Sequence, residues 1–391
     1  MTQRWHILTP EVPPICGGVG DYTAQVAEAL ALKGDDVAVF SPPAATAWRP
    51  PANVRSIALP DRFGSASLRA LTACLERDTS PRVLVQYVPS AFGRRGTNIA
   101  FCRWARSRRQ AGNDVRVMFH EPYLSFHWRP DHFVTALGQR SMAATLLEAS
   151  THVYLSTESW RAYLRRLGPD AVQRAITLPV PSAIPHVRPT DPAVAAVRSR
   201  AIGASVHLVG HFGSYGDHIA PLLRGWIAAL LAADPGMAVL CTGAGSDRFV
   251  QRLQADEPAL RRRVSATGRA SSREIAVHIQ ACDVLLQPYP DGVTTRRTSV
   301  MAALANGRPV VTTEGRLTEP IWRGSGCVAL VRLGDTTGLV EVVLELLNHS
   351  RRHASLASRA LTTYASCFRL HHTIAALRSD RPQTCQRICV G

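Results

Sequence analysis

Short apolar runs alternate with helical patterns along the whole chain, in two series that a proline-rich segment separates. Apolar runs between helical patterns are typical of the buried strands of a parallel sheet whose faces are covered by helices. The runs lie at residues 5–9, 37–41, 83–88, 115–119 and 153–156, then at 207–210, 237–242, 264–267, 283–287, 309–313 and 327–331. The pattern therefore predicts two doubly wound α/β domains.

Five prolines lie between residues 179 and 192, where the composition changes. Clustered prolines restrict the backbone and interrupt helices and sheets, so this segment is typical of a linker. Two doubly wound domains joined in this way are expected to face a central cleft, because such sheets bind ligands at the carboxyl ends of their strands. The expected boundaries are an N-terminal domain at 1–185, the linker at 186–200, a second domain at 201–375 and a tail at 376–391.

Three glycines, Gly17, Gly18 and Gly20, stand between the first apolar run and an amphipathic helical pattern. Glycine lets the backbone approach a ligand closely, and the N-terminus of the following helix favours negative charge. The loop therefore predicts an anion-binding turn, and a tight turn without a ligand is the alternative. The dinucleotide pattern G-x-G-x-x-G is absent from it.

The composition, with 46% hydrophobic and 19% charged residues in 391, is typical of a soluble globular protein. No apolar run reaches the roughly 18 residues of a membrane span. The first residues lack the basic and apolar regions of a signal peptide, so we expect a cytoplasmic protein. The nine cysteines are scattered without paired C-x-x-C spacing, which favours small buried side chains over a metal site.

The formal net charge of +16 is compatible with nucleic acid, an anionic membrane surface or acidic small molecules as partners. Lys33 is the single lysine, so nearly all of the positive charge is arginine. The densest basic patch, residues 101–110, is either a solvated helix face or a peripheral contact with the inner face of a membrane. No DNA- or RNA-binding signature accompanies it, so no nucleic acid partner is expected.

Two stretches of the second series carry polar groups at places where strands meet helices. In LVGHFGSYGDH, at 208–218, an apolar run leads into a glycine-bearing loop that presents N–H groups and hydroxyls to a phosphate. In QPYPDGVTTRRTSVMAALANG, at 287–307, two arginines and four hydroxyls precede a helical pattern. Guanidinium groups bind phosphate in a bidentate way, so an arginine here predicts a phosphate contact. An exposed basic helix start is the alternative.

The motifs GGVGDYTAQVAEAL, FHEPY, DVLLQPYPDG, SVMAALANGRPVVTTEG and TEPIW, in this order, resemble glycosyltransferases of the GT-B fold, specifically family 4. The resemblance covers nearly the whole chain and implies two Rossmann-like domains. It implies transfer of a sugar, with retention, from a nucleotide diphosphate donor held by the second domain to an acceptor held by the first. The donor is expected to be a UDP- or GDP-sugar, with no other cofactor. No D-x-D motif ends a strand, which fits chemistry without a metal.

The resemblance also implies roles for single residues. His120 is expected to contact the transferred sugar, since an imidazole can hydrogen-bond a hydroxyl or relay a proton; a structural histidine is the alternative. The expected catalytic residues are His120, Asp291, Arg296 and Arg297, and the expected acceptor-binding residues are Tyr123 and His127. The expected donor-binding residues are Gly17, Gly18, Gly213, Ser214, Tyr215, Gly243, Arg269, Thr294, Thr295, Thr298, Ser299 and Glu319.

The chain departs from the family pattern at two places. Most members carry two glutamates eight positions apart, where this sequence has Thr294 and Ala302. The usual arginine and lysine clamp is also missing, and His211 and Gly216 stand near its positions. These departures leave two alternatives open, a non-catalytic binding protein or partner subunit and a nucleotide-sugar epimerase. The acceptor, an envelope glycan or lipid intermediate or a natural product, is also left open.

Overall fold

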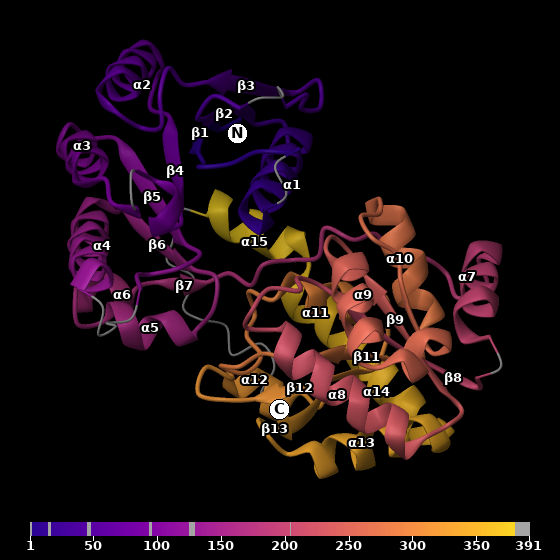
Figure 1. The fold of residues 1–391 in the computed structure, drawn as a ribbon. Helices are drawn as coiled ribbons and strands as arrows, with labels where there is room; N and C mark the ends of the chain where they lie inside the picture. The colour runs from indigo at the N-terminus through magenta and orange to yellow at the C-terminus, as the bar shows by residue number, and fades with distance from the viewer. Residues whose placement is uncertain are drawn as a thin grey trace. The chain divides into compact units, whose positions relative to one another are not determined.

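The computed structural model describes residues 2–14, 17–44, 48–93, 96–124, 130–203 and 205–379. The chain divides into two compact units (Figure 1). Unit 1 comprises the described residues between 2 and 180 together with 370–379, and unit 2 comprises the described residues between 181 and 369.

Unit 1 contains a seven-stranded sheet in which all pairings are parallel, with the order β3-β2-β1-β4-β5-β6-β7. The strands are β1 (Arg4–Leu8), β2 (Asp36–Ser41), β3 (Val54–Ala58), β4 (Arg82–Tyr87), β5 (Asp114–Phe119), β6 (His152–Leu155) and β7 (Ile176–Thr177). The helices are α1 (Gly18–Leu32), α2 (Ser65–Arg77), α3 (Ile99–Gln110), α4 (Pro130–Ala149), α5 (Ser159–Leu164), α6 (Pro169–Gln173) and α15 (Leu370–Arg378). The strand order reverses between β1 and β4, and ligands of such sheets bind at the carboxyl edge near this reversal.

Helix α1 covers one face of this sheet because its apolar residues recur at helical spacing. Tyr22, Val26 and Leu30 are buried in one hydrophobic cluster with Trp5 and Ile7 of β1. Burial of one such side chain stabilises the fold by about 1.5–3 kcal/mol. This packing fixes the start of α1 beside the carboxyl end of β1.

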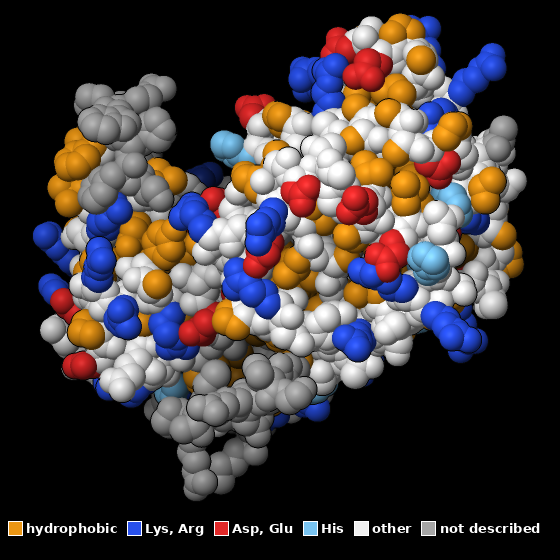
Figure 2. Space-filling view, turned by 90° about the horizontal axis from the view of Figure 1, so that it is seen from below, with side chains coloured by type: hydrophobic (Ala, Val, Ile, Leu, Met, Phe, Trp, Pro, Cys, Tyr) orange, Lys and Arg blue, Asp and Glu red, His pale blue; other side chains and the backbone are white. Residues whose placement is uncertain are grey.

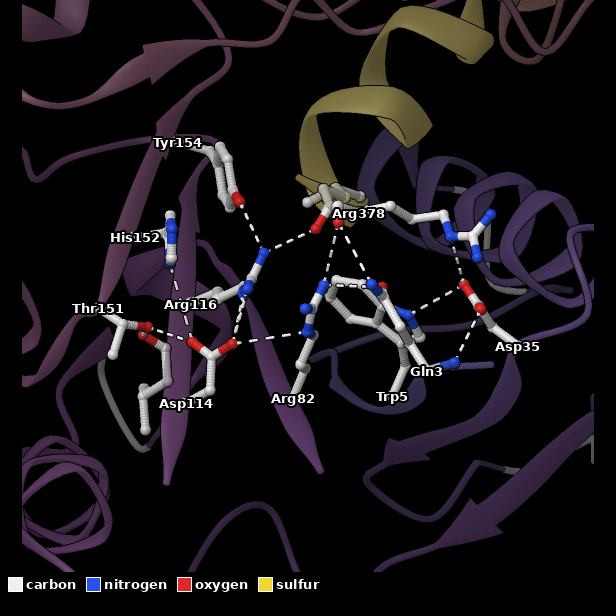
Figure 3. A network of polar contacts seen from close by, with 12 residues as sticks. Gln3, Trp5, Asp35, Arg82, Asp114, Arg116, Thr151, His152, Tyr154 and Arg378 are labelled. Atoms are coloured by element: carbon white, nitrogen blue, oxygen red, sulfur yellow. Dashed lines mark hydrogen bonds and ion pairs between the residues drawn. The ribbon is translucent and has the colours of Figure 1, made fainter. Parts of the chain in front are cut away.

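Helix α15 completes the same core, although it follows all of unit 2 in the sequence. Its last carbonyl groups accept hydrogen bonds from side chains of unit 1 (Figure 3). Arg116 of β5 donates to the Leu377 carbonyl at 2.6 Å, and Gln3 donates to the Arg378 carbonyl at 3.2 Å. Arg116 is 1% exposed and also pairs with Asp114 at 2.7 Å. A buried, charge-assisted network therefore holds the last described helix on unit 1.

Unit 2 contains a six-stranded parallel sheet with the order β10-β9-β8-β11-β12-β13. Its strands are β8 (His207–Phe212), β9 (Met237–Thr242), β10 (Val264–Ala266), β11 (Val284–Gln287), β12 (Val310–Glu314) and β13 (Ala329–Arg332). Its helices are α7 (Pro192–Ile202), α8 (Ala220–Ala233), α9 (Ser246–Asp256), α10 (Ser272–Ala281), α11 (Thr298–Ala305), α12 (Pro320–Gly324), α13 (Thr336–Asn348) and α14 (Ser350–Thr363). The order reverses between β8 and β11.

Two hydrophobic clusters cover the two faces of the unit 2 sheet. Residues of α8, α9 and α13 form one cluster, and residues of α7, α10, α11 and α14 form the other. The strands between them are nearly continuous apolar runs, as expected for strands that are buried on both faces. The predicted pair of doubly wound α/β domains is confirmed.

The structure differs from the expected boundaries in three ways. The second half of the expected linker at 186–200 is helical, because α7 begins at Pro192 and packs against α10 in unit 2. The helix at 370–378 joins unit 1, whereas the sequence prediction placed 201–375 in the second domain and 376–391 in a tail. The pattern also missed β3 and β7, since β3 is largely exposed and β7 has two residues.

Candidate active site

The polar residues of unit 2 gather where β8 and β11 end, at the reversal of strand order. Gln287, the last residue of β11, is fully buried, and its Nε2 donates to the Phe212 carbonyl of β8 at 2.9 Å. Its Oε1 accepts from the Tyr289 hydroxyl at 3.0 Å and from the Ser299 hydroxyl at 3.1 Å. The two hydroxyls lie 2.8 Å apart. Gln287 therefore ties the ends of two strands to the first turn of α11.

Helix α11 begins at Thr298 and directs its first N–H groups to the same place. No acidic residue lies in its first turn, and within the described structure no side chain caps it. The first N–H groups of a helix have no partner within the helix, and the helix dipole adds positive potential there. This start, which contains the predicted donor-binding residues Thr298 and Ser299, can hold an anion.

The two predicted arginines precede this helix directly. Arg297 occupies the N-cap position, and its guanidinium group lies over the ring of Tyr289, 4.3 Å from the ring centre. Tyr289 also contacts Ser299, so Arg297 belongs to the cluster at the start of α11. Arg296 lies in the preceding turn and is partly buried.

Glu319 holds the turn that leads to the arginines. Its side chain is 3% exposed, and its carboxylate accepts from the Thr295 backbone N–H, from the Thr295 hydroxyl at 2.8 Å and from the Trp322 indole at 3.2 Å. Glu319 and Thr295 therefore organise the turn before α11. Thr294 is buried beside them, and its hydroxyl has no hydrogen-bond partner in the described part of the chain.

Asp291 has a different environment. Its carboxylate accepts from Arg316 at 2.9 Å, and its side chain is 37% exposed. The carboxylate is thus engaged in a surface ion pair. Its expected contact with a donor hydroxyl stays a prediction.

The loops after β8, β9 and β10 lie side by side. A Cβ on Gly243 would come within 3.3 Å of the Gly213 carbonyl, and the Gly243 N–H donates to the Thr267 hydroxyl at 3.3 Å. Gly243 has a φ of 108°, which disfavours other residues there. Close approach of these backbones therefore explains this glycine. The predicted Ser214 and Arg269, one on each outer loop, are exposed.

Tyr215 packs between the loops rather than projecting from them. Its hydroxyl donates to the Thr242 carbonyl at 3.1 Å, and its ring contacts Phe249. Beside it a cavity of about 900 Å³ opens between the N-terminal parts of α8 and α9. Arg224, Arg248 and Asp247 are among the charged residues that line this cavity.

His211 is buried beneath the loop that follows β8. Its Nδ1 lies 2.7 Å from the Leu286 carbonyl, and its side chain is 2% exposed. A carbonyl accepts, so Nδ1 carries the proton and Nε2 carries the lone pair. Burial lowers the pKa of His211 to about 4, although the backbone carbonyls of Leu286 and Ser214 act against this. The imidazole is therefore neutral near pH 7.

In unit 1, His120 follows β5 at the carboxyl edge of the sheet. Its Nε2 lies 2.7 Å from Oε1 of Gln86, and its ring meets the edge of Tyr22 of α1 at 5.1 Å. The His120 carbonyl accepts from the Trp160 indole at 2.9 Å and from the Ser156 hydroxyl at 3.1 Å. The fold thus holds the imidazole in one orientation and brings α1 to it.

The glycines at the start of α1 contact a carboxylate that belongs to the chain itself. The Gly20 N–H donates to the Glu11 carboxylate at 3.0 Å, and a Cβ on Gly17 would collide with that carboxylate at 2.0 Å. Helix α1 begins at Gly18, so Gly18 and Gly20 lie in its first turn. Burial and the nearby Glu11 charge raise the pKa of Asp21. The Glu11 carboxylate therefore already occupies part of the predicted anion-binding turn.

The two expected acceptor-binding residues have different outcomes. The Tyr123 hydroxyl donates to the Tyr163 carbonyl at 2.7 Å, and Arg140 lies over its ring at 4.3 Å. Tyr123 is therefore held by contacts with α4 and α5. His127 lies outside the described residues.

The basic stretch at 101–110 forms most of α3. Arg106 pairs with Glu148 at 3.1 Å, and Arg108 lies 3.6 Å from Glu76. Figure 2 shows lysine and arginine side chains spread among acidic and apolar ones over the face in view. None of the helices in the described part of the chain is long and apolar enough to cross a membrane. Membrane contact through α3 stays a prediction.

Sequence reasoning assigned no role to four residues that the structure places at these edges: Gln86, Gln287, Tyr289 and Glu11. A signal for two of them is visible in the sequence. Gln86 and Gln287 are polar residues at or near the end of apolar runs, in VLVQYV and VLLQPY. A buried amide at a strand end requires partners, and these are found in the neighbouring loops.

Comparison with known proteins agrees with this architecture. Residues 17–181 match the family model of the glycosyl transferase 4-like domain, and residues 204–349 match the model of glycosyl transferases group 1. Together the two matches span most of the chain. No curated protein matches the sequence.

Solved structures with the same fold share little sequence with the chain. Sucrose-phosphate synthase from Thermosynechococcus elongatus has a TM-score of 0.72 at 17% identity, with 96% of this chain and 97% of that chain covered. WaaG, a glycosyltransferase involved in lipopolysaccharide biosynthesis, has a TM-score of 0.67 at 16% identity, with 96% of this chain and 100% of that chain covered. HepE from Anabaena, solved in complex with UDP-glucose, has a TM-score of 0.67 at 16% identity, with 95% of this chain and 98% of that chain covered. The chain belongs to the glycosyltransferases of the GT-B fold and resembles family 4, with a 4-like domain followed by a group 1 domain.

Proposed function

We propose that the protein transfers a sugar, with retention, from a UDP- or GDP-sugar to a hydroxyl of a polar acceptor. The start of α11 carries the proposal, because its N–H groups, Arg297 and Ser299 meet at the carboxyl edge of the unit 2 sheet. A diphosphate suits a site that combines a helix N-terminus with a guanidinium group. HepE, which has the same fold, binds UDP-glucose, and this supports a nucleotide sugar as the donor.

In this proposal the leaving diphosphate gains negative charge as the bond to the sugar breaks. Arg297 and the first N–H groups of α11 stabilise that charge, and they are already in place before the reaction. The leaving phosphate takes the proton of the acceptor hydroxyl, so no side-chain base is required. His120 of unit 1 hydrogen-bonds a sugar hydroxyl, and Gln86 orients its ring. Membership of the glycosyltransferases favours transfer over epimerisation or non-catalytic binding.

Single substitutions of the two arginines test the donor site. We expect Arg297→Ala to weaken binding of UDP or GDP by about 10- to 100-fold, since a charge-assisted hydrogen bond is lost. Arg297→Lys should recover part of the loss, because an ammonium group keeps the charge without the bidentate fork. Arg296→Ala should weaken the binding of UDP or GDP less than Arg297→Ala does. Calorimetric titration of UDP, GDP and the bare nucleosides measures these affinities.

Arg262→Ala is the matched control, since this arginine is exposed at the end of a short 3-10 helix before β10 of unit 2. It removes the same charge from the unit and should leave affinity unchanged. If Arg297→Ala binds both diphosphates as the wild type does, the start of α11 is not the donor site. Stereochemistry is tested separately, by NMR of the anomeric configuration in the first product formed.

A further inference from the structure

The lone pair of His211 faces a small space at the donor edge of unit 2. Nε2 is buried and makes no hydrogen bond of normal geometry with the residues that the structure describes, although the Ser214 backbone carbonyl acts on the ring and favours its protonated form. An ideal Cβ on Gly213 would stand 3.4 Å from this atom and 3.6 Å from the Ser299 hydroxyl oxygen. The missing side chain therefore leaves the imidazole and the first turn of α11 facing one space. Leaving a buried acceptor without a hydrogen bond is unfavourable, so a ligand that supplies one would be stabilised here.

Among the neighbouring groups, the imidazole of His211 is the one that can most readily gain a proton. The Tyr215 ring forms a T-shaped pair with the imidazole at 5.1 Å between ring centres, Cys241 lies beside His211 on β9, and the Ser214 backbone carbonyl also acts on the ring. Burial raises the pKa of Tyr215 and Cys241, so they stay neutral. On the α11 side, Ser299 contacts Tyr289, and Arg297 lies over that ring. The contacts described for His211 include no carboxylate.

We propose that His211 takes up a proton when the diphosphate of a nucleotide sugar binds, and that Nε2–H then donates to a phosphate oxygen. In the free protein Nε2 is an acceptor and would repel a phosphate oxygen. A bound anion favours the protonated imidazole, which supplies both a donor and a positive charge. One proton is taken from solvent on binding and returned on release. The inference rests on the proposed donor site.

Calorimetry with UDP-glucose tests the inference, with GDP-mannose as the second probe. Both phosphates of these probes are esterified and do not titrate near neutral pH, so any proton taken up belongs to the protein. At a fixed pH near 7, the wild-type binding enthalpy should depend on the ionisation enthalpy of the buffer, with a slope of the sign for uptake. Affinity should rise by up to about tenfold per unit as the pH falls from about 8 to about 6.5.

His211→Asn should abolish both the buffer dependence and the rise in affinity, because an amide does not titrate. His278→Asn is the matched control: burial lowers the pKa of this histidine too, but it lies on α10, away from the cluster. It should retain the wild-type slope. If the wild type binds a probe without proton uptake, the inference is overturned and the donor site is not, whether or not His211→Asn folds. Proton uptake that persists in His211→Asn has the same meaning. Failure to bind either probe overturns the donor site and the inference together.

Discussion

Two buried amides hold the side chains of His120 and Ser299, for which we propose roles in the site. Gln287 joins the ends of β8 and β11 to Ser299, and Gln86 holds the ring of His120. Neither amide needs to touch a substrate, yet each sets the position of a group proposed to do so. Because a buried hydrogen-bonded side chain cannot easily rotate, such contacts fix the geometry before a ligand arrives.

At this scale we predict the effect of removing His120. His120→Ala should leave the affinity for the donor nucleotide within a few-fold and reduce turnover about 100-fold or more, the scale of a positioned polar group in the transition state. Gln86→Met should reduce turnover less, because the imidazole remains but loses its orientation. Release of nucleotide from UDP-glucose or GDP-mannose, with and without acceptor, measures turnover.

The control for His120 is His152→Asn, at the amino end of β6 on the opposite edge of the same sheet. This variant should keep wild-type turnover. Equal turnover in His120→Ala and the wild type would return His120 to a structural role.

Among the elements, all strands except β3 and β7 were predicted from the sequence, and the place of the last helix was not. Strands such as β9 and β11 are largely apolar runs, so composition alone locates them. Helix α15 is amphipathic in the same way as helices of either unit, and its place depends on contacts such as that of Gln3 with Arg378, 375 positions apart. Local patterns carry no information on such pairs. For the same reason the sequence indicated the glycines before α1 but not that Glu11 fills the turn.

The attachment of α15 gives a prediction for this element. Arg116→Ala should lower the free energy of unfolding of unit 1 by about 3–5 kcal/mol, because it removes a buried ion pair with Asp114 and the hydrogen bond to the Leu377 carbonyl. Although burial alone would raise it, hydrogen bonds from His152 and Arg116 hold the pKa of Asp114 well below its ordinary value. Hydrogen exchange at the α15 amides should become faster. Urea unfolding and exchange mass spectrometry measure the two effects.

Arg55→Ala serves as the comparison, since Arg55 pairs with Asp36 at 2.8 Å while 55% exposed. An exposed pair contributes about 0–1 kcal/mol, so this variant should behave like the wild type. If the free energy of unfolding fell by a similar amount in the two variants, burial of the Arg116 network would add nothing to stability.

Across the whole molecule, buried histidines make stability depend on pH. Burial lowers the pKa of His6 in unit 1 and of His211 and His278 in unit 2, for His211 to about 4. Each folded-state pKa therefore lies below the ordinary value of about 6.5, and the unfolded chain binds more protons between the two values. The free energy of unfolding must fall as the pH drops below about 6.5.

We predict that the wild type loses about 2 kcal/mol of stability from His211 alone between about pH 7 and pH 5. Calorimetric unfolding of the ligand-free protein at the two pH values measures the loss, which His211→Asn should reduce. His186→Asn should not, because that side chain is exposed. A pH dependence in His211→Asn equal to that of the wild type would contradict the prediction.

The return of α15 to unit 1 has a consequence for synthesis on the ribosome. Residues 181–369 of unit 2 are contiguous and can fold as they emerge, but unit 1 lacks part of its core until α15 is translated. At about 5–20 residues per second this delay is roughly 10 to 40 s. During that time Tyr22 and Val26 have no Ile374 or Leu377 to cover them. The half of the protein that is made first is therefore the half that must be completed last.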